Sequence, residues 1–242
     1  MITAYDLALV LVVALQATAI AYLPSPRMKA FLFTVPLPFT IVTLSLGRPM
    51  GAMNVLAVLV MLLYIQCMRL LHQRLGLHIV PAIGLSLAGY IAIGWAGARV
   101  VVSTPTTFWL AIAATFALGM ALYLLMPARA ESAHRTLLPV WQKLPIVCAV
   151  VLLLVLVKEA LQGFASLFPL LGVVGAYESR HSLWTLGRQV PVFIVSIVPL
   201  MAVTYLTQEA LGLPLALLAG WAVFLPLLLL FSRRHWRSNA TA

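Results

Sequence analysis

Long apolar runs are the feature that most restricts the fold of this chain. The runs at residues 7–23, 55–68 and 213–231 continue with few interruptions, and a helix of about 20 apolar residues spans the hydrocarbon core of a bilayer. A transmembrane β-barrel would instead alternate apolar and polar residues along strands of about ten residues. Only 8% of the residues are charged, against about a quarter in soluble domains. The sequence therefore predicts an all-α, polytopic membrane protein.

Dividing the apolar runs at charges and at Pro or Gly gives nine candidate transmembrane segments: 5–23, 30–46, 53–71, 78–97, 107–126, 145–162, 164–177, 190–206 and 213–231. If all nine cross, 12 of the 15 Lys and Arg residues share one side. If segments 30–46 and 164–177 are re-entrant instead, the split is 10 to 5. Because Lys and Arg collect in cytoplasmic loops, the charges favour nine crossings, with the N-terminus outside and the C-terminus in the cytoplasm.

Two stretches of the chain, residues 23–93 and 159–228, repeat one order of features. Each has a short apolar segment with proline, then polar residues with an arginine, a long helix, and a Leu-Gly-Leu triplet before the last span. Segment 107–126 lies between them, so the second copy enters the membrane from the opposite side. The sequence predicts two inverted four-helix repeats, residues 1–100 and 142–242, joined by a linking helix and cytoplasmic loop at 101–141. Inverted repeats are typical of secondary transporters.

Prolines interrupt the corresponding apolar segment of each copy. Pro36 and Pro38 lie in the first copy and Pro169 in the second. Proline lacks a backbone N–H group and breaks or kinks a helix, which frees carbonyl groups that must find partners inside the membrane. We expect the freed carbonyls to bind an ion or a polar solute. The alternative is a kink whose carbonyls are satisfied by a neighbouring helix.

An acidic residue within an apolar span is costly and usually faces a cavity or a partner. The chain has five acidic residues, and Glu159 follows Lys158 late in the segment 145–162. Adjacent residues point about 100° apart on a helix, so the two side chains need not pair. Glu159 is a candidate proton or cation carrier. In the alternative, Lys158 snorkels to the outer headgroups and Glu159 lies at the water boundary.

The densest polar cluster surrounds Glu178, Arg180 and His181. If the helix continues through it, Glu178 and His181 are three residues apart on one face and could form a gate or proton relay. Otherwise the cluster is a short cytoplasmic loop in which Arg180 and Arg188 set the orientation. The first copy has no carboxylate there, and Arg48 is its candidate for an anion contact or an outer gate. Arg48 is otherwise a lone loop arginine.

The second copy resembles small bacterial inner-membrane proteins of the GlpM type. The resemblance lies in residues 167–169, in Ala176-Tyr177 and in the polar residues that follow. Those proteins are about half as long, so the chain is similar to a fused pair of them with a linking helix between. The resemblance implies location in the inner membrane and a link to exopolysaccharide production. It transfers no functional residues to this chain.

Enzyme and metal signatures are weak in this sequence. Residues 84–89 superficially resemble a serine nucleophile turn, but small residues in a membrane helix are usually close-packing positions. His72 and His78 have no carboxylate nearby, so we expect no metal site, cofactor or enzymatic activity. The sequence predicts a secondary transporter or permease for a small molecule or ion, which works by alternating access between the inverted halves and couples transport to protons through Glu159 or Glu178. It contacts membrane lipids, binds no nucleic acid and could form a homo-oligomer. The alternative is a non-transporting accessory protein of an envelope or exopolysaccharide assembly system.

Overall fold

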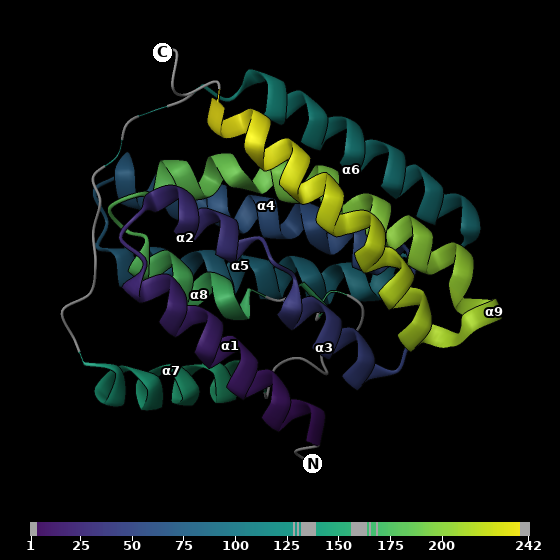
Figure 1. Cartoon of the computed structure of the whole chain (residues 1–242), viewed down its shortest axis with the longest axis horizontal. Coiled ribbons are helices and arrows are strands. Elements are labelled where there is room, and N and C mark those ends of the chain that lie inside the picture. Colours follow the sequence, from purple (N-terminus) through teal and green to yellow (C-terminus); the bar gives the residue numbers. More distant parts are fainter. Residues whose placement is uncertain are drawn as a thin grey trace.

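All regular elements are helices in the part of the chain that the structure describes. The computed structural model describes residues 4–127, 129, 131, 139–155, 164, 166–167 and 169–237. The helices are α1 (Ala4–Tyr22), α2 (Pro26–Phe33), α3 (Leu37–Leu46), α4 (Ala52–Gln73), α5 (Ile79–Val100), α6 (Pro105–Leu125), α7 (Val140–Val155), α8 (Leu170–Glu178) and α9 (Leu183–Arg237), shown in Figure 1. The prediction of an all-α fold is confirmed for these residues.

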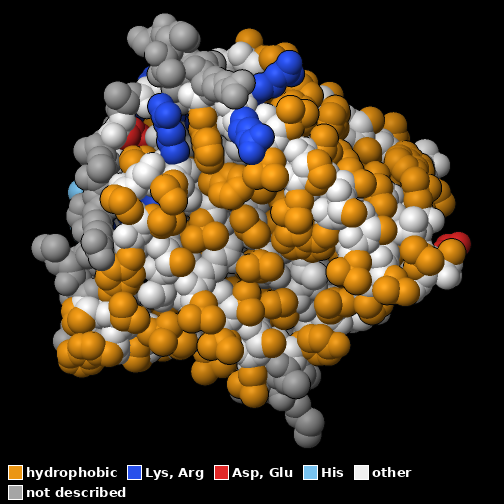
Figure 2. All heavy atoms as spheres, viewed as in Figure 1, with side chains coloured by type: hydrophobic (Ala, Val, Ile, Leu, Met, Phe, Trp, Pro, Cys, Tyr) orange, Lys and Arg blue, Asp and Glu red, His pale blue; other side chains and the backbone are white. Residues whose placement is uncertain are grey.

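Five helical segments among the described residues are long and apolar enough to cross a membrane. They are Pro26–Leu46, Ala52–Gln73, Ile79–Val100, Pro105–Leu125 and Leu183–Trp236, and a shorter apolar helix covers Leu7–Tyr22. Figure 2 shows hydrophobic side chains over most of the visible face, with Lys and Arg gathered near the C-terminal end of α9. A continuous apolar surface with charges at its edge fits a multi-pass membrane protein.

Glycine lies at two positions where the chain changes direction after a long helix. The backbone of Gly212 has φ 73° and ψ 158°, a conformation that is essentially restricted to glycine. It divides α9 into segments 183–211 and 213–237, which match two separate spans in the sequence analysis. Gly76, between α4 and α5, also has a positive φ of 68°. The two Leu-Gly-Leu triplets therefore serve the same purpose, because each reverses or redirects the chain after a long helix.

The ends of several helices meet in a basic region that we call the basic end. Lys29 Nζ of α2 donates to the carbonyl oxygen of Glu178 at the end of α8, at 3.2 Å. Arg188 Nε of α9 donates to the carbonyl oxygen of Met126 after α6, at 3.1 Å. Gln189 Nε2 and Ser232 Oγ, 3.0 Å apart, join the beginning and the end of α9. The ring centroids of Phe31 in α2 and Trp236 in α9 lie 5.7 Å apart, so both ends of α9 meet α2 and the ends of α6 and α8 in this region.

Helix α4 and the 183–211 segment of α9 run antiparallel through the centre of the bundle. Near the C-terminus of α4, the Arg69 guanidinium lies 4.4 Å from the ring centroid of Trp184, at the start of α9. Just before α4, Met50 N donates to Gln208 Oε1 at 2.7 Å, and Gln208 Nε2 donates to Met50 O at 3.2 Å. We call this second region the opposite end. The main hydrophobic core lies between these two helices and α1, α3 and α8.

Candidate functional site

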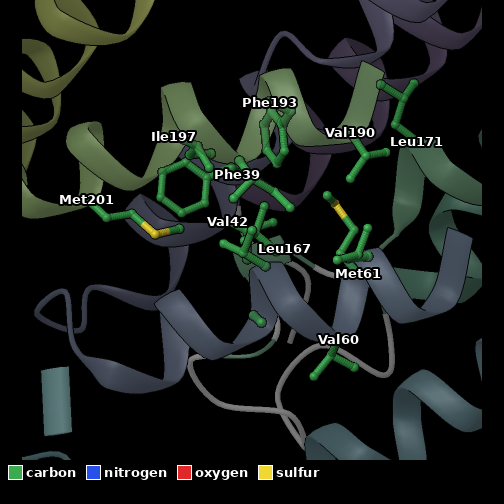
Figure 3. Close-up of a cluster of buried hydrophobic side chains, with 14 of the residues drawn as sticks. Phe39, Val42, Val60, Met61, Leu167, Leu171, Val190, Phe193, Ile197 and Met201 are labelled. Atoms are coloured by element: carbon green, nitrogen blue, oxygen red, sulfur yellow. The ribbon is translucent and has the colours of Figure 1, made fainter. Parts of the chain in front are cut away.

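A cavity of about 50 Å³ lies between the two proline-containing breaks. Pro36 and Pro38 of the first break and Pro169 of the second all line it. Helices α4 and α9 complete its walls. Figure 3 shows side chains from these helices facing one another, among them Met61 of α4 and Val190 and Phe193 of α9, and all three also line the cavity. We call it the central cavity.

A side chain of α1 forms hydrogen bonds with the backbone of the first break. Helix α2 ends at Phe33, and α3 begins at Leu37 after Pro36. Gln16 Nε2 donates to the carbonyl oxygens of Leu32, at 2.8 Å, and Val35, at 3.0 Å. The expectation that freed carbonyls bind an ion or solute is therefore wrong for these two groups. The alternative applies, because a neighbouring helix supplies the donor that hydrocarbon cannot.

Side chains of α4 and α5 form hydrogen bonds with the second break. Pro169 directly precedes the first residue of α8. Tyr90 Oη of α5 donates to the carbonyl oxygen of Phe164 at 2.8 Å. Asn54 Nδ2 of α4 donates to Ser166 Oγ at 3.1 Å. Polar residues from one half of the chain thus position the broken segment of the other half.

Three polar side chains line the central cavity among the described residues: Thr34, Tyr64 and Ser166. Thr34 Oγ1 donates to the carbonyl oxygen of Phe31 at 2.7 Å, and Ser166 Oγ accepts from Asn54. The Tyr64 hydroxyl is buried and has no hydrogen-bond partner among the residues that the structure describes. A buried polar group without a partner destabilises the protein by about 1–3 kcal/mol. Among the described residues that line this cavity, Tyr64 is therefore the one whose polar group is left without a hydrogen bond.

A larger cavity of about 220 Å³ lies at the opposite end, which we call the vestibule. Arg48, Thr43, Asn54 and Ser103 are among its lining residues, and Arg48 is exposed. Asn54 lines the vestibule while its partner Ser166 lines the central cavity. The Asn54–Ser166 hydrogen bond therefore lies between the two spaces.

Tight packing separates the central cavity from the basic end. The Phe33 ring of α2 lies against two glycines of α8: a Cβ atom on Gly175 would lie 3.0 Å from Phe33 Cδ2, and one on Gly172 would lie 3.9 Å from Phe33 Cζ. Beyond this ring, the Lys29 ammonium reaches the end of α8 at Glu178. Glycine at these positions lets α8 approach α2 closely.

The site residues that the sequence suggested from charge do not line the central cavity where the structure describes them. Glu178 is 3% exposed and is the last residue of α8, so the helix does not continue to His181 and the two residues do not share a helical face, which leaves the loop alternative. His181 is exposed, and Arg180 Nη1 donates to the carbonyl oxygen of Tyr177 at 3.0 Å. Arg48 is at the opposite end. Lys158 and Glu159 lie outside the described residues.

Sequence reasoning assigned no role to Gln16, Asn54 or Tyr64. Gln16 and Asn54 carry amide side chains within apolar spans, and a polar residue in such a place is itself a signal of a packing or binding role. Tyr64 gave no signal, because tyrosine is common in membrane helices and only the structure shows that its hydroxyl lacks a partner. The described residues contain no group of three His, Cys, Asp or Glu that could hold a metal ion.

Comparison with protein-family models, with curated proteins and with solved structures gives no match to this chain.

Proposed function

We propose that this chain is a permease for a small solute that works by alternating access between two inverted halves. The observation that carries the proposal is the central cavity, which is lined by a broken helix from each half of the chain. Secondary transporters with inverted repeats place their substrate between the repeats at such broken helices, because irregular backbone is tolerated inside a membrane where it lines a cavity. The solute would bind between Pro36, Pro38 and Pro169.

The arrangement of the helices supports the inverted relation. Helix α4 of the first half and segment 183–211 of the second half occupy the same place in the repeated pattern, and they run antiparallel. Each is followed by a Leu-Gly-Leu triplet whose glycine has a positive φ. A proline directly precedes the first residue of α3 and of α8. A two-fold axis in the membrane plane would relate these pairs.

The two routes from the central cavity differ in how they are closed. Toward the vestibule, the Asn54–Ser166 hydrogen bond is a narrow polar closure. Toward the basic end, Phe33 packs against α8 and the Lys29 ammonium contacts the end of that helix. In the proposed cycle these closures open in turn. Separation of α2 from α8 would expose the cavity at the basic end, and rupture of the Asn54–Ser166 bond would expose it to the vestibule.

The same proposal places the basic end in the cytoplasm. Arg27, Arg69, Arg74 and Arg129 join Lys29 and Arg188 at this end. Because Lys and Arg collect on the cytoplasmic side of an inner membrane, the vestibule would face outward. Glu178 then belongs to the inner closure, and we assign it no coupling role because it lies outside the central cavity.

A reversible disulfide tests alternating access. Phe33→Cys combined with Gly175→Cys, in a background with Cys67→Ser and Cys148→Ala, places two thiols where the Phe33 ring and the α8 backbone are in contact, within reach of a disulfide. Proteoliposomes would be tested by light scattering with acetamide, glycerol, tetramethylammonium and methanesulfonate, with ionophores to remove membrane potentials. At least one solute is expected to cross, to stop crossing on oxidation and to cross again after reduction.

Two controls accompany the disulfide. Each single-cysteine variant should be insensitive to oxidation, and the oxidised pair should keep its melting temperature, so that a loss of flux is not a loss of fold. Equal flux before and after complete cross-linking would contradict alternating access at the basic end. Failure of the protein to move any of the four solutes above protein-free liposomes would contradict the permease itself.

A further inference from the structure

We infer that the central cavity takes a small uncharged solute with an apolar part and one hydrogen-bonding group, which binds the Tyr64 hydroxyl. This inference rests on the proposed function and adds the chemical class of the substrate. It depends on three properties of the cavity: one polar group left without a partner, walls without charge, and a small volume.

The Tyr64 hydroxyl differs from a comparable buried tyrosine nearby. Tyr64 is 2% exposed and Tyr90 is 1% exposed. The Tyr90 hydroxyl donates to the carbonyl oxygen of Phe164, whereas the Tyr64 hydroxyl has no partner in the described part of the chain and belongs to a residue that lines the cavity. A buried hydroxyl is normally satisfied, so an orphaned one beside a cavity indicates a ligand. Such a ligand needs one group that accepts or donates a hydrogen bond.

The walls of the cavity exclude a charged solute. None of the described lining residues is Lys, Arg, His, Asp or Glu. The rings of Phe33, Phe39 and Phe193 and the proline rings form much of the surface. An ion in this space would lose its hydration without gaining a counter-charge, which is far costlier than the transfer of a neutral molecule. Lys29 of the closure at the basic end and Arg48 of the vestibule lie outside these walls.

The volume of the cavity matches a solute of a few heavy atoms. The cavity measures about 50 Å³, and one water molecule needs about 10–15 Å³ of such space. The space therefore holds a molecule about as large as three to five adjacent water molecules. Acetamide has this size, a methyl group for the aromatic walls and an amide for the Tyr64 hydroxyl.

Tyr64→Phe tests the inference in the same proteoliposomes. This change removes the hydroxyl and keeps the ring, so acetamide flux should fall by about threefold to tenfold, the usual effect of losing one hydrogen bond. The melting temperature should hold or rise, because the variant loses a buried polar group without a partner. Tyr205→Phe is the matched control: the Tyr205 ring stacks on Phe108 and the residue does not line the cavity, so the same chemical change there should leave the acetamide flux per folded protein unchanged.

The outcomes separate the inference from the proposed function. Flux of acetamide or glycerol that depends on the Tyr64 hydroxyl, with no flux of tetramethylammonium or methanesulfonate, supports both. Flux of a charged solute alone, or acetamide flux that is equal in wild type and Tyr64→Phe, overturns the inference and leaves the permease standing. Absence of flux for all four solutes overturns the proposed function and the inference together.

Discussion

Replacing Val190 by phenylalanine is expected to lower solute flux by about tenfold or more, which corresponds to a barrier increase of at least about 1.4 kcal/mol. Val190 of α9 is buried and lines the central cavity beside Met61 and Phe193, as Figure 3 shows. The larger ring would enter the cavity, so the solute would lose its place between the two breaks. Because the ring enters existing space, the fold should survive, and the melting temperature should stay within a few degrees of the wild type.

Val198→Phe is the matched control for this prediction. Val198 lies on the same helix and is equally buried, but it is not among the residues that line the cavity. An additional ring there meets a filled core, and overpacking of this kind costs about 1–3 kcal/mol. We therefore expect Val198→Phe to reduce stability and Val190→Phe to reduce flux. The account fails here if Val190→Phe transports like the wild type while a structure shows the ring inside the cavity.

Gln16→Leu is expected to reduce the free energy of unfolding by about 2 kcal/mol, the effect of removing one side chain that donates to two partly buried carbonyl groups. Gln16 is 5% exposed, and its amide nitrogen bonds the carbonyl oxygens of Leu32 and Val35. Each carbonyl keeps a backbone donor, Val35 N at 3.3 Å and Leu37 N at 3.0 Å, which limits the loss. Unfolding in mixed micelles, followed by circular dichroism, measures the change.

Thr18→Val on the same helix is the control for Gln16. The Thr18 hydroxyl is buried without a hydrogen-bond partner among the described residues, and valine has nearly the same shape. Its replacement should leave stability unchanged or raise it slightly, because no hydrogen bond is lost. If Gln16→Leu is as harmless as Thr18→Val, then α1 does not maintain the first break and the two carbonyls are satisfied in another way.

The helices themselves were predictable because hydropathy and helix-breaking residues act locally. The interruption at Pro36 and Pro38 appears as the gap between α2 and α3, and the triplet around Gly212 as the kink in α9. Apolar length determines which segments fit a bilayer, and proline and glycine determine where they break. No knowledge of the neighbouring helices was needed for these features.

The candidate site was less predictable, since it depends on contacts between residues far apart in the chain. Charge directed attention to Glu178 and Arg48, which the structure places at different ends. The central cavity is lined instead by uncharged residues such as Tyr64 and Ser166. The donor for the freed carbonyls, Gln16, comes from a helix whose position relative to the break could not be read from local sequence.

The central claim is that the space between the two proline breaks opens to each side of the membrane in turn. Val190→Cys, in the background without Cys67 and Cys148, places a thiol of nearly the same size in the wall of that space. Vesicles of known orientation would be treated with a charged methanethiosulfonate reagent from one side or the other, with Val198→Cys as the buried control. The reagent reaches the thiol while the cavity is open to water and therefore keeps its hydration, whereas a transported ion would have to lose its hydration in the closed cavity. The account predicts that Val190→Cys reacts from both sides and Val198→Cys from neither. Reaction of Val190→Cys from one side only, or from neither, would contradict alternating access at this cavity.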